Sequence, residues 1–214
     1  MKSFDELFLQ TRVVAILRKV EPSLLCDVLD ALYDGGIRLA EITYDHSGEI
    51  SDETIAKNIR AAHEHMSGRM YIGAGTVTRA SQVELTASVG GSFIISPNTD
   101  AEIIKLSRKH GLISMPGAMT VSEISTALDA GADYVKLFPA SSLGPKFVKA
   151  VLAPFSDVRL VAVSGVTPEN MREYLDAGCV GFGIGSGIGQ SALLSKRDFN
   201  AISENARRYV DAAR

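Results

Sequence analysis

A closed barrel of eight parallel strands, each followed by a helix, is the fold class that this sequence of 214 residues predicts. Strand and helix patterns alternate about eight times after one short helix, which requires a parallel sheet with helices outside it. The strand patterns are continuous apolar runs, as expected for strands covered on both faces. Eight units in this length fit a (β/α)8 TIM barrel better than an open flavodoxin-like sheet, which would leave some units without a place. No change of composition marks a linker, so we expect one domain, 1–214, with an extra N-terminal helix.

The first half of the chain begins with an amphipathic helix over residues 3–11. The run Val13-Val14-Ala15-Ile16-Leu17-Arg18 is typical of a strand buried on both faces, with Arg18 as its last residue. Pro22 begins a helix to about Tyr33, and the glycines after Asp34 end it. By the same patterns this half also contains strands at 38–43 and 70–74, a polar loop at 45–51, a helix to about residue 65 and a helix at 79–88.

Prolines end three strands in the second half, because proline cannot donate a hydrogen bond to a neighbouring strand. Pro97 follows the strand 92–96, Pro116 follows 112–115, and Pro139 ends a strand that begins near Ala132. The remaining elements are helices to about residue 110 and at 121–130, 145–153, 168–177 and 198–212, strands at 159–163 and 180–184, and a glycine-rich turn extending to Gly189.

Composition excludes several classes of protein. The formal charge is −3, with 46% apolar and 22% charged residues, so there is no basic field for nucleic acid. No apolar run reaches the ~18 residues that suggest a membrane span, and the N-terminus does not resemble a signal peptide. Cys26 and Cys179 fit no metal spacing, and we interpret both as buried thiols in a reducing cytoplasm.

Lys136 lies in an apolar strand, between Tyr134 and Phe138 at a spacing of two. Burial of an ammonium group is costly and is usually relieved by a lowered pKa that leaves some free amine. A free amine in a dry pocket attacks carbonyl groups, so the pattern indicates a lysine that forms a Schiff base. The alternative is a lysine at a strand end that reaches solvent.

Arg18 and Glu41 also fall near the carboxyl ends of predicted strands. In a (β/α)8 barrel these ends meet at one mouth, so we expect both residues near Lys136. A carboxylate beside a lysine imine can move protons at the adjacent carbon and at a departing hydroxyl. The alternative is a structural ion pair between Glu41 and either Arg18 or Lys136.

Two glycine-containing turns follow the last two predicted strands. Ser164-Gly165 follows the first and Gly185-Ser186 the second, which are the places where such barrels often bind phosphate. Glycines let backbone N–H groups approach an anion, although tight packing alone is the alternative explanation. The sequence Gly73-Ala74-Gly75-Thr76 lacks the third glycine of a dinucleotide fingerprint.

We predict no metal site. His63 and His65 are two residues apart on a predicted helix and therefore face different directions. Glu41, Asp45 and His46 offer an oxygen-rich group, but no second histidine converges on it.

The chain resembles the class I pyruvate aldolases that act on 2-keto-3-deoxy-6-phosphogluconate (KDPG) and 4-hydroxy-2-oxoglutarate (KHG). The resemblance extends from about Val13 to Ile188. It depends on the motifs Ala15-Ile16-Leu17-Arg18, Glu41-Ile42-Thr43, Gly73-Ala74-Gly75-Thr76-Val77, Ile95-Ser96-Pro97, Met115-Pro116-Gly117, Lys136-Leu137-Phe138-Pro139 with Gly144-Pro145 and Lys149-Ala150, and Gly183-Ile184-Gly185-Ser186.

The resemblance implies Lys136 as the nucleophile that forms the imine and Glu41 as the general acid and base. It also implies a cytoplasmic homotrimer that needs no cofactor. Further implied roles are contacts to the pyruvate part by Arg18 and Thr76, pocket walls from Pro97 and Phe138, and phosphate contacts from Gly165 and Ser186.

The chain departs from the family pattern in two places. Many KDPG aldolases have Thr-Gly-Gly before the phosphate turn, where this chain has Val163-Ser164-Gly165. Val163 is more similar to the branch that acts on the galactonate epimer, whereas Ser164 replaces a glycine in both branches. Asp45 stands where some members carry a second arginine.

The resulting hypothesis is a lyase that cleaves a 2-keto-3-deoxy-6-phosphoaldonate to pyruvate and glyceraldehyde 3-phosphate, and that also accepts 4-hydroxy-2-oxoglutarate. One alternative is a phosphosugar epimerase or isomerase, which needs paired acid and base groups but no amine. Another is a non-catalytic binder of sugar phosphates.

Overall fold

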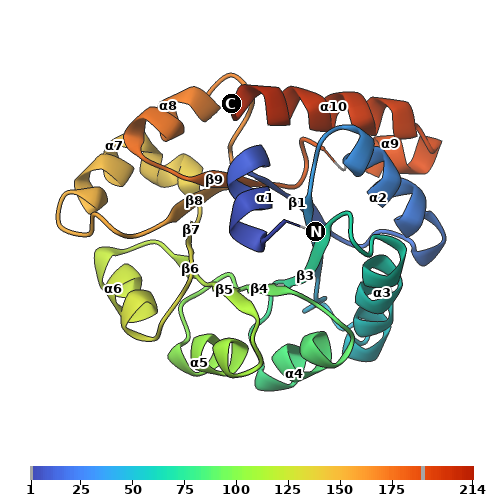
Figure 1. Ribbon diagram of the computed structural model, residues 1–214, viewed down its shortest axis with the longest axis horizontal. Coiled ribbons are helices and arrows are strands. Elements are labelled where there is room, and N and C mark those ends of the chain that lie inside the picture. Colours follow the sequence, from blue (N-terminus) through green and yellow to red (C-terminus); the bar gives the residue numbers. More distant parts are fainter. Residues whose placement is uncertain (1, 189–190) are drawn as a thin grey trace.

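The computed structural model describes residues 2–188 and 191–214, and its centre is one parallel sheet that curves into a ring (Figure 1). The strands follow the order β5-β4-β3-β2-β1-β9-β8-β7-β6. Their bounds are β1 Val13–Leu17, β2 Leu39–Thr43, β3 Tyr71–Gly75, β4 Phe93–Ile95, β5 Ile113–Met115, β6 Gly117–Ala118, β7 Val135–Leu137, β8 Leu160–Val163 and β9 Gly181–Ile184.

The two ends of this sheet, β5 and β6, are consecutive segments separated only by Pro116. β5 pairs with β4, and β6 pairs with β7, so the ring closes through the chain at this proline. Counted as one interrupted strand, they complete a barrel of eight strands. The predicted (β/α)8 fold is therefore confirmed.

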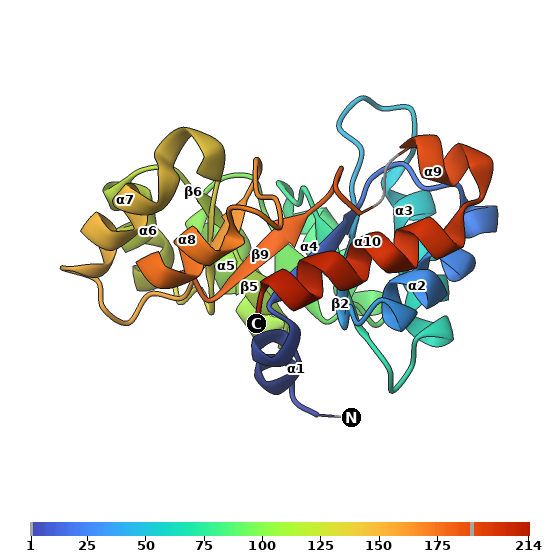
Figure 2. The same ribbon diagram turned by 90° about the horizontal axis from the view of Figure 1, so that it is seen from above.

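All the helices except α1 surround the ring on its outside (Figures 1 and 2). Their bounds are α1 Phe4–Thr11, the 3-10 helix η1 Pro22–Leu24, α2 Leu25–Asp34, α3 Asp52–His65, α4 Ala80–Ser88, α5 Ala101–Lys109, α6 Val121–Asp129, α7 Ala140–Leu152, α8 Met171–Ala177, α9 Ser191–Lys196 and α10 Phe199–Ala212.

Two helices differ from the sequence-based expectation. α7 begins at Ala140 rather than at Pro145, because one helical turn precedes Gly144, whose φ of 72° breaks the helix. Proline and glycine at 144–145 therefore mark a kink inside α7 and not its start. α9 was not expected, and the predicted glycine-rich turn ends at Gly189, outside the described residues.

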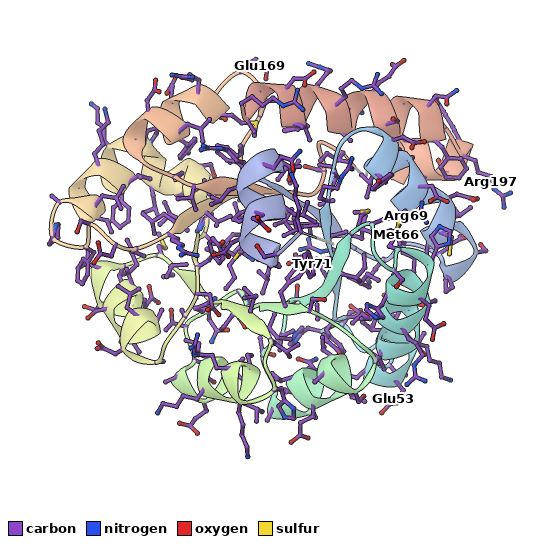
Figure 3. The ribbon with its side chains drawn as sticks, in the orientation of Figure 1. Glu53, Met66, Arg69, Tyr71, Glu169 and Arg197 are labelled. Carbon is purple, nitrogen blue, oxygen red and sulfur yellow. The ribbon has the colours of Figure 1, made fainter. Side chains whose placement is uncertain are left out.

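α1 closes the N-terminal end of the barrel rather than packing outside it (Figure 2). Phe8 is fully buried and lies edge-on to the Tyr134 ring, with ring centroids 5.0 Å apart. The Tyr134 hydroxyl donates to Asp5 at 2.6 Å. Tyr71, labelled in Figure 3, lies next to α1 and contacts the Phe4 ring at 5.4 Å. This aromatic layer closes the amino-terminal end of the barrel, which leaves the opposite end open to ligands.

The two cysteines differ in burial. Cys179 is 3% exposed, as predicted, but Cys26 is only partly buried, so that prediction was wrong for Cys26. Cys26 lies at the edge of the apolar face of α2, which Leu25, Val28 and Leu29 direct toward the sheet. No helix in the described part of the chain is long and apolar enough to cross a membrane.

Candidate active site

The carboxyl ends of the strands form the mouth of the barrel, opposite α1. Glu41 lies inside β2 and Lys136 inside β7. Arg18 lies one residue beyond the end of β1, not within the strand as expected, and its side chain is exposed. The predicted phosphate turns follow β8 and β9, at the same end of the barrel.

Glu41 is 2% exposed and lies between Ile16 of β1 and Gly73 of β3 in the sheet register. Gly75 packs directly on its carboxyl group, since a Cβ built on Gly75 would lie 2.5 Å from Cδ and Oε1. Its Oε2 atom is buried without a hydrogen-bond partner. Burial raises the pKa of Glu41 to about 7, although the charges of Lys136 and Arg18 oppose the shift.

Lys136 is 7% exposed and pairs with Gly117 on one side and Val161 on the other. Its Nζ lies 4.6 Å from the centre of the Phe138 ring, which is 37% exposed at the mouth. Burial lowers the pKa of Lys136, the Glu41 charge opposes this shift, and the Arg18 charge adds to it. Lys136 is thus a buried lysine with an increased fraction of free amine, and not a lysine that reaches solvent.

Glu41 and Lys136 line the same small cavity inside the barrel, which is too narrow to hold a water molecule. No ion pair shorter than 4.0 Å joins Glu41 to Lys136 or Arg18, all of which lie in the described part of the chain. The structural ion pair considered from sequence is therefore absent from these side chains. The other residues of this cavity are Val14, Ile16, Ile95, Met115, Val161, Val163 and Gly183.

A larger cleft of about 970 Å³ continues from this cavity toward solvent. Ile16, Val163 and Gly183 belong to the walls of both, so the two spaces adjoin. Predicted site residues in the cleft wall are Arg18, Phe138, Ser164, Gly165, Gly185 and Ser186, and the wall also contains Val166, Thr167, Ile184, Gly187 and Tyr209. A ligand in the cleft can therefore extend one end toward Lys136 and the other toward the two turns.

The turn after β8 packs closely against the start of α7. The carbonyl oxygen of Ser164 accepts a hydrogen bond from the Ser141 amide at 3.1 Å. A Cβ on Gly165 would overlap the Ser141 side chain, and Gly165 has a φ of 72°. Ser164 also has a positive φ, 80°, which is unusual for a residue other than glycine. The backbone of Ser164 is therefore in a conformation that costs a serine more energy than it would cost a glycine.

Thr76 and Pro97 lie at the mouth, after β3 and β4 respectively, and both are partly buried. Neither belongs to the walls of the two cavities. Thr76 has a φ of 57°, and its carbonyl oxygen lies 3.0 Å from Nε2 of His46. Pro97 contacts Gly117 through its carbonyl group. The structure thus brings these two residues to the rim and the other predicted residues to the walls.

Asp45 and His46 do not join Glu41 in a metal site. Asp45 accepts hydrogen bonds within its own loop from the amides of Ser47 and Ile50, at 3.1 Å each. His46 is bonded to Thr76 instead. Among residues 2–188 and 191–214, no group of three or more His, Cys, Asp or Glu side chains is arranged to hold a metal ion.

Sequence reasoning missed Gly75 as the support of the Glu41 carboxyl group, and it missed Tyr209. Gly75 belongs to the motif Gly73-Ala74-Gly75-Thr76-Val77, on which the family resemblance partly depends. Nothing in that motif indicated that the absence of a side chain at Gly75 leaves room for Glu41. Tyr209 occupies an ordinary apolar position of an amphipathic helix, so the pattern gave no signal of a place in the cleft.

The family model for KDPG and KHG aldolase matches residues 4–205. The chain belongs to this family. It is 34% identical to the 2-dehydro-3-deoxy-6-phosphogalactonate aldolase of Escherichia coli K12, over 94% of this chain and 95% of that protein. This family of aldolases consists of carbon–carbon lyases, and the chain is an enzyme of this type.

Solved structures of aldolases agree with this assignment. A structure described as native KDPGal aligns with a TM-score of 0.84 at 34% identity, covering 94% of this chain and 93% of that one. The KDPG aldolase of Legionella pneumophila, captured with pyruvate as a covalent carbinolamine, aligns with a TM-score of 0.84 at 26% identity, covering 94% and 95%. That carbinolamine is an adduct formed on the way to a Schiff base, which is the chemistry that the sequence predicts for this chain.

Proposed function

We propose that this aldolase cleaves a 2-keto-3-deoxy-6-phosphoaldonate to pyruvate and glyceraldehyde 3-phosphate through a Schiff base on Lys136. The observation that carries the proposal is a buried lysine and a buried, unpaired glutamate that face one cavity at the sealed end of an open cleft. A carboxyl group with a pKa of about 7 gives and accepts protons readily at neutral pH.

The reaction begins when the free amine of Lys136 adds to the C2 carbonyl group of the substrate. Loss of water from the carbinolamine leaves an iminium ion. Glu41 then removes the proton of the C4 hydroxyl as the C3–C4 bond breaks, and the bonding electrons pass into the iminium group. The aldehyde departs, the resulting enamine takes a proton at C3, and water releases pyruvate and the amine.

The remaining site residues are assigned to the two ends of the substrate. Arg18 is a cation in the cleft wall and pairs with the carboxylate, with Thr76 at the keto end. Phe138 and Pro97 enclose the region above Lys136. Backbone N–H groups of the turns at Ser164-Gly165 and Gly185-Ser186, together with both serine hydroxyls, bind the distal phosphate.

We further propose that the galactonate epimer is preferred over the gluconate epimer. Val163 lines both cavities, and it presents an apolar side chain where many KDPG aldolases have threonine. The 34% identity to a phosphogalactonate aldolase supports the same preference. Comparison of kcat/KM for the two 6-phosphorylated epimers and 4-hydroxy-2-oxoglutarate, measured by pyruvate release, tests this order.

Borohydride reduction in the presence of pyruvate tests the mechanism. The iminium ion formed with pyruvate is reduced to a stable secondary amine, so mass spectrometry should find the adduct on Lys136. A phosphosugar epimerase or isomerase on this barrel needs no such adduct, and a non-catalytic binder releases no pyruvate. Failure to trap the protein under conditions in which it turns over substrate would falsify the mechanism.

The assembly and location of the protein are also proposals. The family resemblance predicts a cytoplasmic homotrimer. Light scattering coupled to size-exclusion chromatography measures the mass of the particle, and a mass equal to that of one 22.9 kDa chain would contradict the trimer.

A further inference from the structure

Tyr209 presents an unpaired hydroxyl group to the cleft. Four tyrosines are buried, and the hydroxyls of Tyr44, Tyr134 and Tyr174 each form a hydrogen bond to a protein oxygen. Tyr209 is 7% exposed, yet its hydroxyl has no hydrogen bond within residues 2–188 and 191–214. The hydroxyl is not fully enclosed, so water can bond to it in the free protein and a ligand in the cleft can take the place of that water.

The hydroxyl of Tyr209 opens toward the ligand space. The side chain belongs to the wall of the 970 Å³ cleft, and its oxygen is not among the fully enclosed unpaired atoms, of which Oε2 of Glu41 is the example. Tyr209 comes from α10, which also contacts the loop before α8 through the ion pair of Arg208 with Glu169 at 3.5 Å. Glu169 is labelled at this edge of the barrel in Figure 3. The C-terminal helix α10 therefore places the Tyr209 side chain at the mouth of the barrel.

Gly187 places the same hydroxyl beside the turn after β9. A Cβ built on Gly187 would overlap the Tyr209 oxygen, so a glycine at this position allows the turn to lie against the hydroxyl. Gly185 and Ser186, assigned to the distal phosphate, are the two residues before it. The tyrosine oxygen and the predicted phosphate turn therefore lie side by side.

We propose that Tyr209 is a further substrate-binding residue, whose hydroxyl donates a hydrogen bond to the distal phosphate. The proposal rests on the proposed function and adds a donor from a helix outside the two turns. Arg18 is the cation among the cleft residues, and it is assigned to the carboxylate at the other end. The phosphate is then recognised by neutral donors, to which a phenol is suited because it binds phosphate oxygens without repelling Arg18. Burial raises the pKa of Tyr209, so the hydroxyl keeps its proton.

Tyr209→Phe removes the hydroxyl and keeps the ring that packs in the core. The readout is the ratio of kcat/KM for the 6-phosphorylated substrate to kcat/KM for 4-hydroxy-2-oxoglutarate, which has no phosphate. Loss of a hydrogen bond to a charged group should lower this ratio roughly tenfold or more, chiefly through KM for the phosphorylated substrate. A ratio within about twofold of the wild-type value overturns the proposal.

Tyr44→Phe is the matched control, because Tyr44 is buried outside the cleft and its hydroxyl donates to the Gln82 carbonyl at 3.2 Å. It should lower the melting temperature and leave the ratio unchanged. Tyr209→Phe should leave the melting temperature unchanged, because its hydroxyl has no bond to lose in the free enzyme.

Binding of inorganic phosphate separates this proposal from the proposed function. Phosphate should raise the melting temperature of the wild-type protein more than that of Tyr209→Phe. If neither substrate releases pyruvate, the proposed function fails, and the phosphate measurement still tests Tyr209. Equal stabilisation of the two proteins by phosphate, or no stabilisation of either, overturns the assignment of Tyr209.

Discussion

Gly75→Ala tests whether the Glu41 carboxyl group must stay where the structure places it. The new Cβ would lie 2.5 Å from Cδ and Oε1 and 2.8 Å from Oε2, whereas ordinary contact begins near 3.4 Å. Gly75 does not have a left-handed φ, so alanine adds no strain of that kind. The carboxyl group must therefore move by roughly 1 Å. Displacement of a reacting group by about 1 Å costs on the order of 10²-fold in rate, or about 2.7 kcal/mol in the barrier.

The assay is steady-state pyruvate release by the wild-type enzyme, Gly75→Ala, Glu41→Ala and the double variant. We expect Gly75→Ala to lower kcat by about 10²-fold while borohydride still traps pyruvate on Lys136. In the Glu41→Ala background no carboxyl group remains to be displaced, so the second change should have almost no effect. Two results refute the reasoning: kcat of Gly75→Ala within threefold of wild type, or an equal loss in both backgrounds.

Three further changes test the electrostatics of the site. Lys136→Met should lower turnover by at least about 10³-fold and abolish borohydride trapping, and retention of either by the folded variant contradicts the Schiff base. Glu41→Gln should raise the free energy of unfolding at pH 8 by about 3 kcal/mol. The pKa of Glu41 rises from 4.5 to about 7 on folding, so the ionised carboxylate destabilises the folded protein as pH rises through this interval. Urea unfolding below pH 4.5 should show no such increase, and an increase that is the same at every pH contradicts the raised pKa. Asp45→Ala should lower the melting temperature and raise KM. Asp45 lies 3.7 Å from Lys19, the neighbour of Arg18, so its loss should let Arg18 move away from the substrate carboxylate. An unchanged KM shows that this contact does not position Arg18.

The barrel was predictable because its signals are local and repeated. Each strand is a short apolar run, and proline follows several of them, as Pro97 and Pro116 do. Eight such units leave few ways to arrange a parallel sheet. The sequence did not reveal where α1 packs, because an amphipathic helix has the same pattern whether it covers the side of a barrel or closes its end.

The positions of Glu41 and Lys136 were predictable for a different reason. Ionisable side chains within apolar strands are unusual, and the fold brings the carboxyl ends of all strands to one mouth. The distinction between an ion pair and two unpaired groups depends on separations of a few ångströms, which no spacing in the sequence encodes. Tyr209 was harder to predict, because its role depends on how α10 packs against a turn more than twenty residues earlier in the chain.

The two unpaired groups at the site have a common physical basis. Neither Oε2 of Glu41 nor the hydroxyl of Tyr209 has a protein partner, but only Oε2 of these two atoms is fully buried, whereas the hydroxyl opens into the cleft. The buried Oε2 destabilises the free protein by about 1–3 kcal/mol, while water in the cleft relieves this cost for the hydroxyl. A substrate that supplies the missing partners binds more tightly for the same reason, since its hydroxyl and phosphate replace no existing protein hydrogen bond. The barrel can sustain both groups because the aromatic layer under α1 and the helices around the sheet bury a large apolar core, independently of the mouth.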